Sequence, residues 1–102
     1  MLSFRNAGNG NTNLTRNEMD KYQKLINQIL LARADANIEF DELCNLLLRL
    51  GFEKRIRGSH HIFRKSGVEE KINLQHEGHQ AKPYQVKQIR NLITKYHLEE
   101  LL

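Results

Sequence analysis

The spacing of apolar residues changes near Gly51, and this change restricts the possible fold more than any other feature. Before Gly51, apolar residues recur every three or four positions, which is the repeat of an amphipathic helix. After it come short charged and apolar segments between turn residues, a pattern typical of β-strands. The helical repeat returns after Pro83. The sequence therefore predicts an α+β fold with helices packed on one face of a sheet.

Three helices are predicted. The first spans about Arg16 to Arg33 and follows a capping box in which Thr15 is the N-cap residue. The second has apolar residues at positions 40, 43, 44, 47 and 50 and ends at Gly51, which suits the left-handed position after a helix. The third starts near Pro83, because the first turn of a helix does not need the N–H group that proline lacks.

Three short strands are predicted after the second helix, at residues 53–57, 60–64 and 68–74. Turn residues at Gly58-Ser59 and around Gly67 separate them, which indicates a three-stranded antiparallel meander. Residues 75–82 are polar and are predicted to form a loop before the last helix.

The length of 102 residues fits one small domain with two additions at its N-terminus. Residues 1–14 are predicted to be a disordered arm, residues 15–36 an extra helix and linker, and residues 37–102 the main domain. The lone Cys44 excludes an internal disulfide and lies on an apolar helix stripe, as a core residue does. No apolar run approaches the ~20 residues of a membrane span, and no signal peptide is recognised. We therefore expect a cytoplasmic protein without membrane contact.

The charge is distributed unevenly along the chain. Residues 1–50 carry six basic and six acidic side chains, whereas residues 51–102 carry ten basic and six acidic ones. The whole net charge of +4 therefore lies in the second half, together with all five histidines. A basic half favours a polyanionic partner, although a cationic surface without any partner has the same composition.

The densest group of reactive side chains lies in the second strand and the turn before it. His60 and His61 are adjacent and are flanked by Arg57 and Arg64. Metal-free RNA cleavage needs a base to activate the ribose 2′-hydroxyl and cations to stabilise the charge that develops on the phosphate. Because side chains alternate along a strand, only one imidazole can point away from the helices unless the strand is bulged. The alternative is that both are ordinary strand residues, one packed and one solvated.

Two other chemistries fit these residues less well. The candidate ligands for a zinc ion are His60, His61, His76 and His79. The last two are one residue too close for the His-Glu-x-x-His motif, which also requires a helix. A Ser59–His60 nucleophile pair would need side chains that a strand directs apart, so Ser59 is interpreted as a turn residue or a phosphate contact. We expect neither a metal nor another cofactor.

A further basic group lies on the last helix. Lys82 is at its start, and Lys87 and Arg90 share one helix face. Cations near a helix N-terminus can hold phosphates together with the free backbone N–H groups. The solvated face of an amphipathic helix has the same pattern.

Taken together, segments from the second helix to the last one resemble the HicA family of bacterial toxins. The segments are Ile38–Leu43, Leu50-Gly51-Phe52 and Arg57–Phe63, of which Leu-Gly-Phe followed closely by Gly-Ser-His is the most specific. The resemblance runs from about Ile38 to Leu98. The chain departs from the family pattern in three places. Asn73–His76 lacks the proline of a Val-Pro-x-His element, Lys82–Gln85 replaces Gly-Thr, and residues 1–36 exceed the minimal toxin, as in a longer subtype.

This resemblance implies a double-stranded-RNA-binding-like α-β-β-β-α domain, here preceded by an extra helix. It also implies the activity of an mRNA interferase from a type II toxin–antitoxin system. The catalytic histidine of the family follows Gly-Ser and corresponds to His60. Some members have their histidine one position later, which keeps His61 as the alternative. A HicB-like antitoxin would cover this site.

The leading hypothesis is therefore a metal-independent endoribonuclease that cleaves mRNA. His60 is its expected general base, and His61 is a proton donor or the alternate base. The other residues expected to contact RNA are Lys54, Arg55, Arg57, Ser59, Arg64, Lys82, Lys87 and Arg90. Two alternatives stay open: a non-catalytic RNA-binding module of the same fold, and a protein whose first helix mediates oligomerisation.

Overall fold

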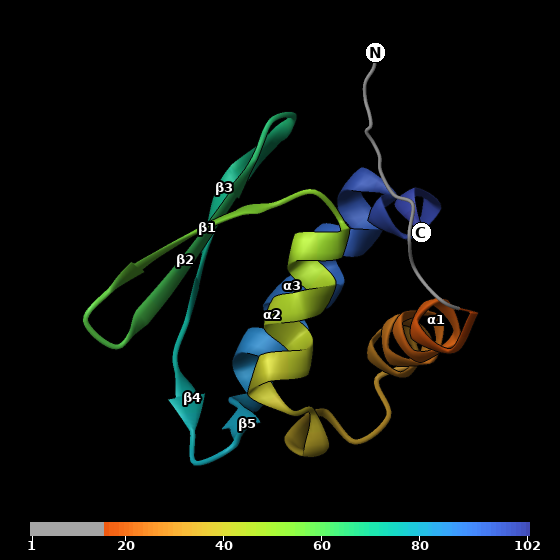
Figure 1. Ribbon diagram of the computed structural model, residues 1–102, viewed down its shortest axis with the longest axis horizontal. Helices are drawn as coiled ribbons and strands as arrows, with labels where there is room; N and C mark the ends of the chain where they lie inside the picture. Colours follow the sequence, from red (N-terminus) through yellow and green to blue (C-terminus); the bar gives the residue numbers. More distant parts are fainter. Residues whose placement is uncertain (1–15) are drawn as a thin grey trace.

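The computed structural model describes residues 16–102 and shows the predicted α+β fold (Figure 1). Its helices are α1 (Arg16–Leu30), α2 (Phe40–Arg49) and α3 (Pro83–Tyr96), with short 3-10 helices η1 (Asp35–Asn37) and η2 (Leu98–Leu101). Its strands are β1 (Glu53–Arg57), β2 (His60–Lys65), β3 (Val68–Leu74), β4 (His76–Glu77) and β5 (Gln80–Ala81). The predicted N-terminal arm and the N-cap residue Thr15 lie outside the described residues.

The three-stranded sheet has the predicted meander topology. Strands β1, β2 and β3 are neighbours in chain order and pair antiparallel. Gly58 and Gly67 stand in the two connecting turns with positive φ angles of 59° and 88°, a conformation that glycine adopts without steric cost. The pairing of β2 with β3 shifts between Phe63 and Lys65, so a bulge interrupts the sheet near its second turn.

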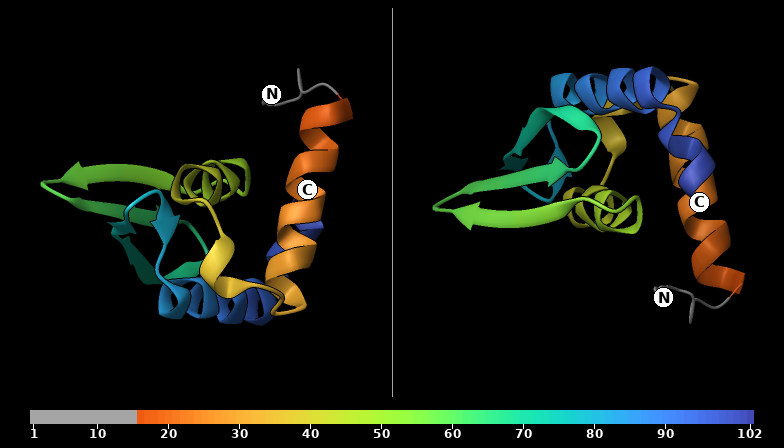
Figure 2. Two further views of the ribbon diagram at one scale, coloured as in Figure 1. Left: turned by 90° about the horizontal axis from the view of Figure 1, so that it is seen from below. Right: turned by 90° about the horizontal axis from the view of Figure 1, so that it is seen from above.

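The helices lie on one face of this sheet, as predicted. In Figure 1, α2 and α3 lie next to the sheet and α1 lies on their far side. Figure 2 shows the β1–β2 hairpin extending beyond the helices. The buried apolar side chains come from all three helices and from one face of β2 and β3. Those that are almost completely buried include Ile26, Ile29, Leu43, Leu46, Leu47, Phe63, Ile72, Leu74, Ile89 and Ile93.

The segment predicted as a polar loop is more ordered than the sequence indicated. Within residues 75–82, β4 and β5 pair antiparallel. The backbone N–H of Ala81 donates to the carbonyl of Ile38 at 2.9 Å, and that of Phe40 donates to the carbonyl of His79 at 2.9 Å. The loop prediction was wrong here because two-residue strands are too short to show a periodicity. This hairpin is thereby attached to the start of α2.

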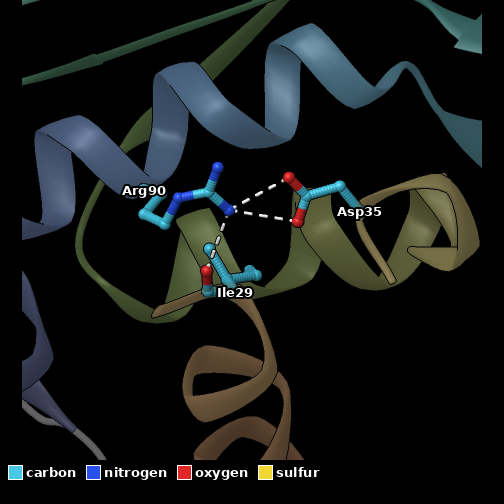
Figure 3. Close-up of polar contacts among 3 residues, drawn as sticks. All are labelled: Ile29, Asp35 and Arg90. Carbon is cyan, nitrogen blue, oxygen red and sulfur yellow. Dashed lines mark hydrogen bonds and ion pairs between the residues drawn. The ribbon is translucent and has the colours of Figure 1, made fainter. Parts of the chain in front are cut away.

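The first helix ends at Leu30, three residues before its predicted end at Arg33. The chain leaves the helix through Ala32, which has a positive φ angle of 56°. Beyond this turn, one side chain of α3 ties the end of α1 to η1 (Figure 3). The Arg90 Nη1 group donates to the carbonyl of Ile29 at 3.1 Å and to both carboxylate oxygens of Asp35 at 3.0 and 3.1 Å.

The apolar stripe of α1 packs within the molecule. Tyr22, Ile26 and Ile29 are all part of the common core, whereas Met19 and Leu31 remain exposed. The buried residues of α1 are therefore occupied by intramolecular contacts. Among residues 16–102, no helix is long and apolar enough to cross a membrane.

Candidate functional site

Strand alternation separates the two adjacent histidines of β2. His60 is exposed and pairs with Arg57 across the hairpin. His61 pairs with Leu74 on β3 and is half-buried on the same face as Phe63, which packs against the helices. The two imidazoles therefore belong to different surfaces: His60 to the open face of the sheet, and His61 to the helix-covered face.

Side chains at the end of β3 and just after it contact His60, the first residue of β2, and Ser59, the residue before it. The His60 Nδ1 atom lies 3.1 Å from the Asn73 side-chain oxygen. The Gln75 side-chain amide donates to the hydroxyl oxygen of Ser59 at 3.1 Å. The predicted turn residue Ser59 is therefore held beside His60 by a hydrogen bond from Gln75, the residue that follows β3.

Basic side chains cover the open face of the sheet. A hollow on this face is lined by Glu53, Arg55, Arg57, Ile62, Arg64 and Lys71, and also by Lys54, which pairs with the buried Phe63 and so alternates to the covered face. Glu53 is the one acidic residue among these lining residues, so the hollow has a positive charge. The face therefore combines cations from all three strands with the exposed imidazole of His60. Such a surface suits a phosphate backbone.

Lys71 and Asn73 belong to this face but were not among the residues predicted from the sequence. Both are exposed, and they alternate along β3 with the buried Ile72 and Leu74. That alternation was visible in the sequence. Their position beside β2 depends on the register of the pairing, in which Asn73 lies opposite Ile62. The alternation along β3, combined with the correct register between β2 and β3, would have predicted both residues.

A second hollow lies on the helix side of the sheet and contains three histidines. It is lined by Glu39, Phe40, Asp41, His61, His76, Gly78 and His79. The Phe40 ring contacts the imidazoles of His61 and His76 edge-on, with centroid distances of 4.9 and 5.2 Å. The Nδ1 atom of His76 is 2.9 Å from the carbonyl oxygen of Gly78. The hairpin of β4 and β5 thus brings two histidines that are distant in sequence to His61.

The environment of His61 favours its neutral form. Burial lowers the pKa of His61 from its ordinary value of 6.5, and the charges of Lys54 and His76 lower it further, while Asp41 opposes them. Its Nδ1 atom is buried and has no hydrogen-bond partner among residues 16–102. His61 is therefore disposed to remain unprotonated near neutral pH.

Cys44 has the environment of a core residue. It is 3% exposed, and burial raises the pKa of its thiol to about 11, although the nearby charge of Lys54 acts in the opposite direction. A thiol with so high a pKa is almost entirely protonated at neutral pH. The residue is a packing element of α2.

The basic residues of α3 lie in the helix layer. Lys82 precedes the first turn of α3, and Lys87 is exposed. Arg90 is engaged by Ile29 and Asp35, and the side chains of Arg90 and Asp35 are only 17% and 23% exposed. The structure does not bring these three residues to the open face of the sheet. Their contact with RNA stays a prediction.

The four histidines considered as zinc ligands do not come together at one point. His60 lies on the open face, whereas His61, His76 and His79 line the second hollow. Within the described part of the chain, the ligand atoms close enough to share an ion belong to His97, Glu99 and Glu100, which lie within 4.8 Å of one another. That group is located at the C-terminal end of the fold and uses none of those four histidines.

These features define a class of protein: a small α+β domain of the double-stranded-RNA-binding type, with a basic sheet face and an exposed histidine. The model of a protein family described as HicA toxin of bacterial toxin–antitoxin matches residues 40–95. The match covers more than half of the chain, and the chain belongs to the HicA toxin family. Comparison with curated proteins and with solved structures gave no match.

Membership of this family means that the chain is a toxin of a bacterial toxin–antitoxin system, from a family of RNA-cleaving toxins. The family match starts at the first residue of α2 and ends in the last turn of α3. It therefore includes the whole three-stranded sheet, the hollow on the open face and, apart from Glu39, the residues that line the second hollow. Helix α1 lies outside it, and the proposed division of the chain into three parts stays a prediction.

Proposed function

We propose that this protein is a type II toxin that cleaves mRNA without a metal ion, with His60 as general base on the open face of the sheet. The observation that carries this proposal is the position of His60. It is exposed beside Arg57 on a face that also carries Arg55, Arg64 and Lys71. A base and a group of cations therefore lie on one surface that the helices leave uncovered.

The chemistry follows from these groups. The neutral imidazole of His60 takes the proton of a ribose 2′-hydroxyl, whose oxygen attacks the adjacent phosphorus. The bond from phosphorus to the 5′-oxygen breaks, and that oxygen takes a proton from water, because His61 faces the other side of the sheet. The products are a 2′,3′-cyclic phosphate and a free 5′-hydroxyl. Arg57 and Arg64 stabilise the extra negative charge on the phosphoryl oxygens.

The hollow on the helix side supports a second candidate location for the base. There the neutral His61 lies near His76, and His79 lines the same space. In that arrangement His61 would accept the proton and a second histidine would donate one to the leaving oxygen. The open face is preferred because its cations come from all three strands, whereas Glu39 and Asp41 border the hollow on the helix side.

The partners of this function are RNA and an antitoxin. A HicB-like antitoxin that neutralises the protein would cover the open face and offer acidic groups to its arginines. Such a system acts on mRNA, so the cytoplasm is the proposed location. The supporting observation is again the exposed basic face, which the described chain does not cover with any of its own helices.

The test compares His60→Ala with His61→Ala, purified free of other nucleases, on a long RNA in EDTA between pH 5 and 9. We expect His60→Ala to lose roughly 10²–10⁴-fold in cleavage rate while it keeps its fold, because a general base contributes about that much. Wild-type cleavage in EDTA should persist and depend on pH. Toxicity on expression should disappear with the same substitution.

Three results would contradict parts of this proposal. Full cleavage by His60→Ala with a large loss in folded His61→Ala would move the base to the helix side. Loss of wild-type cleavage in EDTA would remove metal independence. Binding of RNA whose affinity falls steeply with salt, without cleavage at any pH, would indicate the RNA-binding module instead.

A further inference from the structure

The hydrogen bond between His60 and Asn73 lies on the surface and contributes little to the stability of the fold. Both side chains are exposed, and the atoms joined are His60 Nδ1 and Asn73 Oδ1, at 3.1 Å. A hydrogen bond between exposed side chains replaces bonds to water and contributes little to stability. Asparagine is also depleted in β-strands, where a β-branched residue fits better. A residue that disagrees with its local structure points to function.

The chemistry of the contact determines the tautomer of the imidazole. The Asn73 amide presents its oxygen to Nδ1, and an amide oxygen only accepts hydrogen bonds, so in this orientation the Nδ1 atom of His60 carries the proton and donates it. A neutral imidazole has one donor and one acceptor nitrogen. The Nε2 atom then holds the free electron pair, which is what a general base needs.

Buried contacts fix the end of β3 where Asn73 lies. The Gln85 side chain on α3 is 2% exposed. In one orientation its amide donates to the backbone carbonyl of Asn73 at 3.4 Å. In the other, its nitrogen donates to the carbonyl of Gln75 at 3.0 Å, and its oxygen accepts from the N–H of Gln75 at 3.2 Å. Both orientations attach this end of β3 to the helix layer, so Asn73 is presented to His60 from a rigid position.

We propose that Asn73 is a positioning residue that holds His60 as the Nδ1–H tautomer and so keeps Nε2 free to accept the proton of the substrate. The catalytic meaning of this role rests on the proposed function. The tautomer itself does not, because it belongs to the resting protein. Asn73 thereby acts through His60 and needs no contact with RNA.

The first experiment determines the tautomer by NMR on the full chain with ¹⁵N-labelled histidine, without RNA, at a pH where the imidazoles are neutral. We expect His60 to show a protonated Nδ1 and an unprotonated Nε2. Asn73→Val should convert His60 mainly to the Nε2–H tautomer, and Asn73→Asp should preserve the Nδ1–H form. A wild-type His60 that is mainly Nε2–H would overturn the proposal, whatever the variants do.

The second experiment measures cleavage by the same proteins. We expect kcat of Asn73→Val to fall roughly tenfold or more with little change in KM, because the base would present the wrong nitrogen. Asn73→Asp should restore most of kcat. The control is Asn91→Ala, which removes an exposed asparagine from α3 and should behave as wild type.

The outcomes separate the two proposals. An unchanged kcat in Asn73→Val, with cleavage lost in His60→Ala, would overturn the positioning role and leave the proposed function intact. Full cleavage by His60→Ala would instead contradict the base, while the NMR result would still decide the tautomer. If Asn73→Val does not fold, the wild-type spectrum alone decides whether the Nδ1–H form exists.

Discussion

The two faces of the three-stranded sheet share a backbone but differ in almost every other property. On the covered face, Phe63, Ile72 and Leu74 are fully buried against the helices. On the open face, the sheet carries Arg55 and Arg57 on β1, Arg64 and His60 on β2, and Lys71 on β3. The comparison shows how a strand of alternating residues can separate stability from chemistry: one face supplies the apolar core, and the other is free to carry charge.

The largest expected effect comes from comparing two adjacent residues of β2 that lie on opposite faces of the sheet. Phe63→Ala should lower the free energy of unfolding by about 3–5 kcal/mol, because it removes a completely buried ring. Ile62→Ala, one residue earlier and on the open face, should cost about 1 kcal/mol or less, since its side chain is only half-buried. Urea unfolding followed by circular dichroism measures both. Equal losses would mean that the open face also contributes to the core.

The sequence was sufficient to predict the separation of His60 from His61, because alternation along a strand is a local property. The neighbours of these residues could not be predicted in the same way. Asn73 reaches His60 through a strand register that includes a bulge, and Asp35 meets Arg90 across 55 positions of sequence. The hairpin that brings His76 and His79 to His61 has strands of two residues each. Such contacts depend on tertiary packing and leave no periodic pattern.

The second prediction, with an effect of intermediate size, concerns the cations that bind RNA. Lys71→Gln on the open face should weaken RNA binding and reduce the slope of log affinity against log salt by about 0.7, the value for one phosphate contact on a single strand. Lys87→Gln is the matched variant, because Lys87 is an exposed lysine on α3. An RNA site confined to the open face predicts an unchanged slope for this variant, whereas contact with α3 predicts a reduced one. Filter binding across a salt series measures both proteins.

The result for Lys87→Gln decides how far the RNA site extends. A slope reduced only in Lys71→Gln would restrict the site to the sheet. A similar reduction in both variants would extend it to α3, in agreement with the RNA contacts predicted for Lys82 and Lys87. If Lys87→Gln reduced the slope and Lys71→Gln left it unchanged, the RNA would bind on the helix side. The open face would then not be the RNA-binding surface.

The smallest expected effect concerns His61 on the covered face and the loss of stability at acidic pH. The pKa of His61 is lowered in the folded protein, first by burial and then by Lys54 and His76, whereas the unfolded chain titrates near 6.5. As the pH falls below about 6.5, the unfolded chain therefore binds this proton first. The free energy of unfolding is retained above that pH and decreases as the pH falls through the folded pKa. His61→Phe and His61→Gln cannot bind this proton, so both should lose stability less steeply than wild type between pH 7 and 5. Urea unfolding at each pH tests this, and parallel slopes in all three proteins would mean that His61 titrates as it does in the unfolded chain.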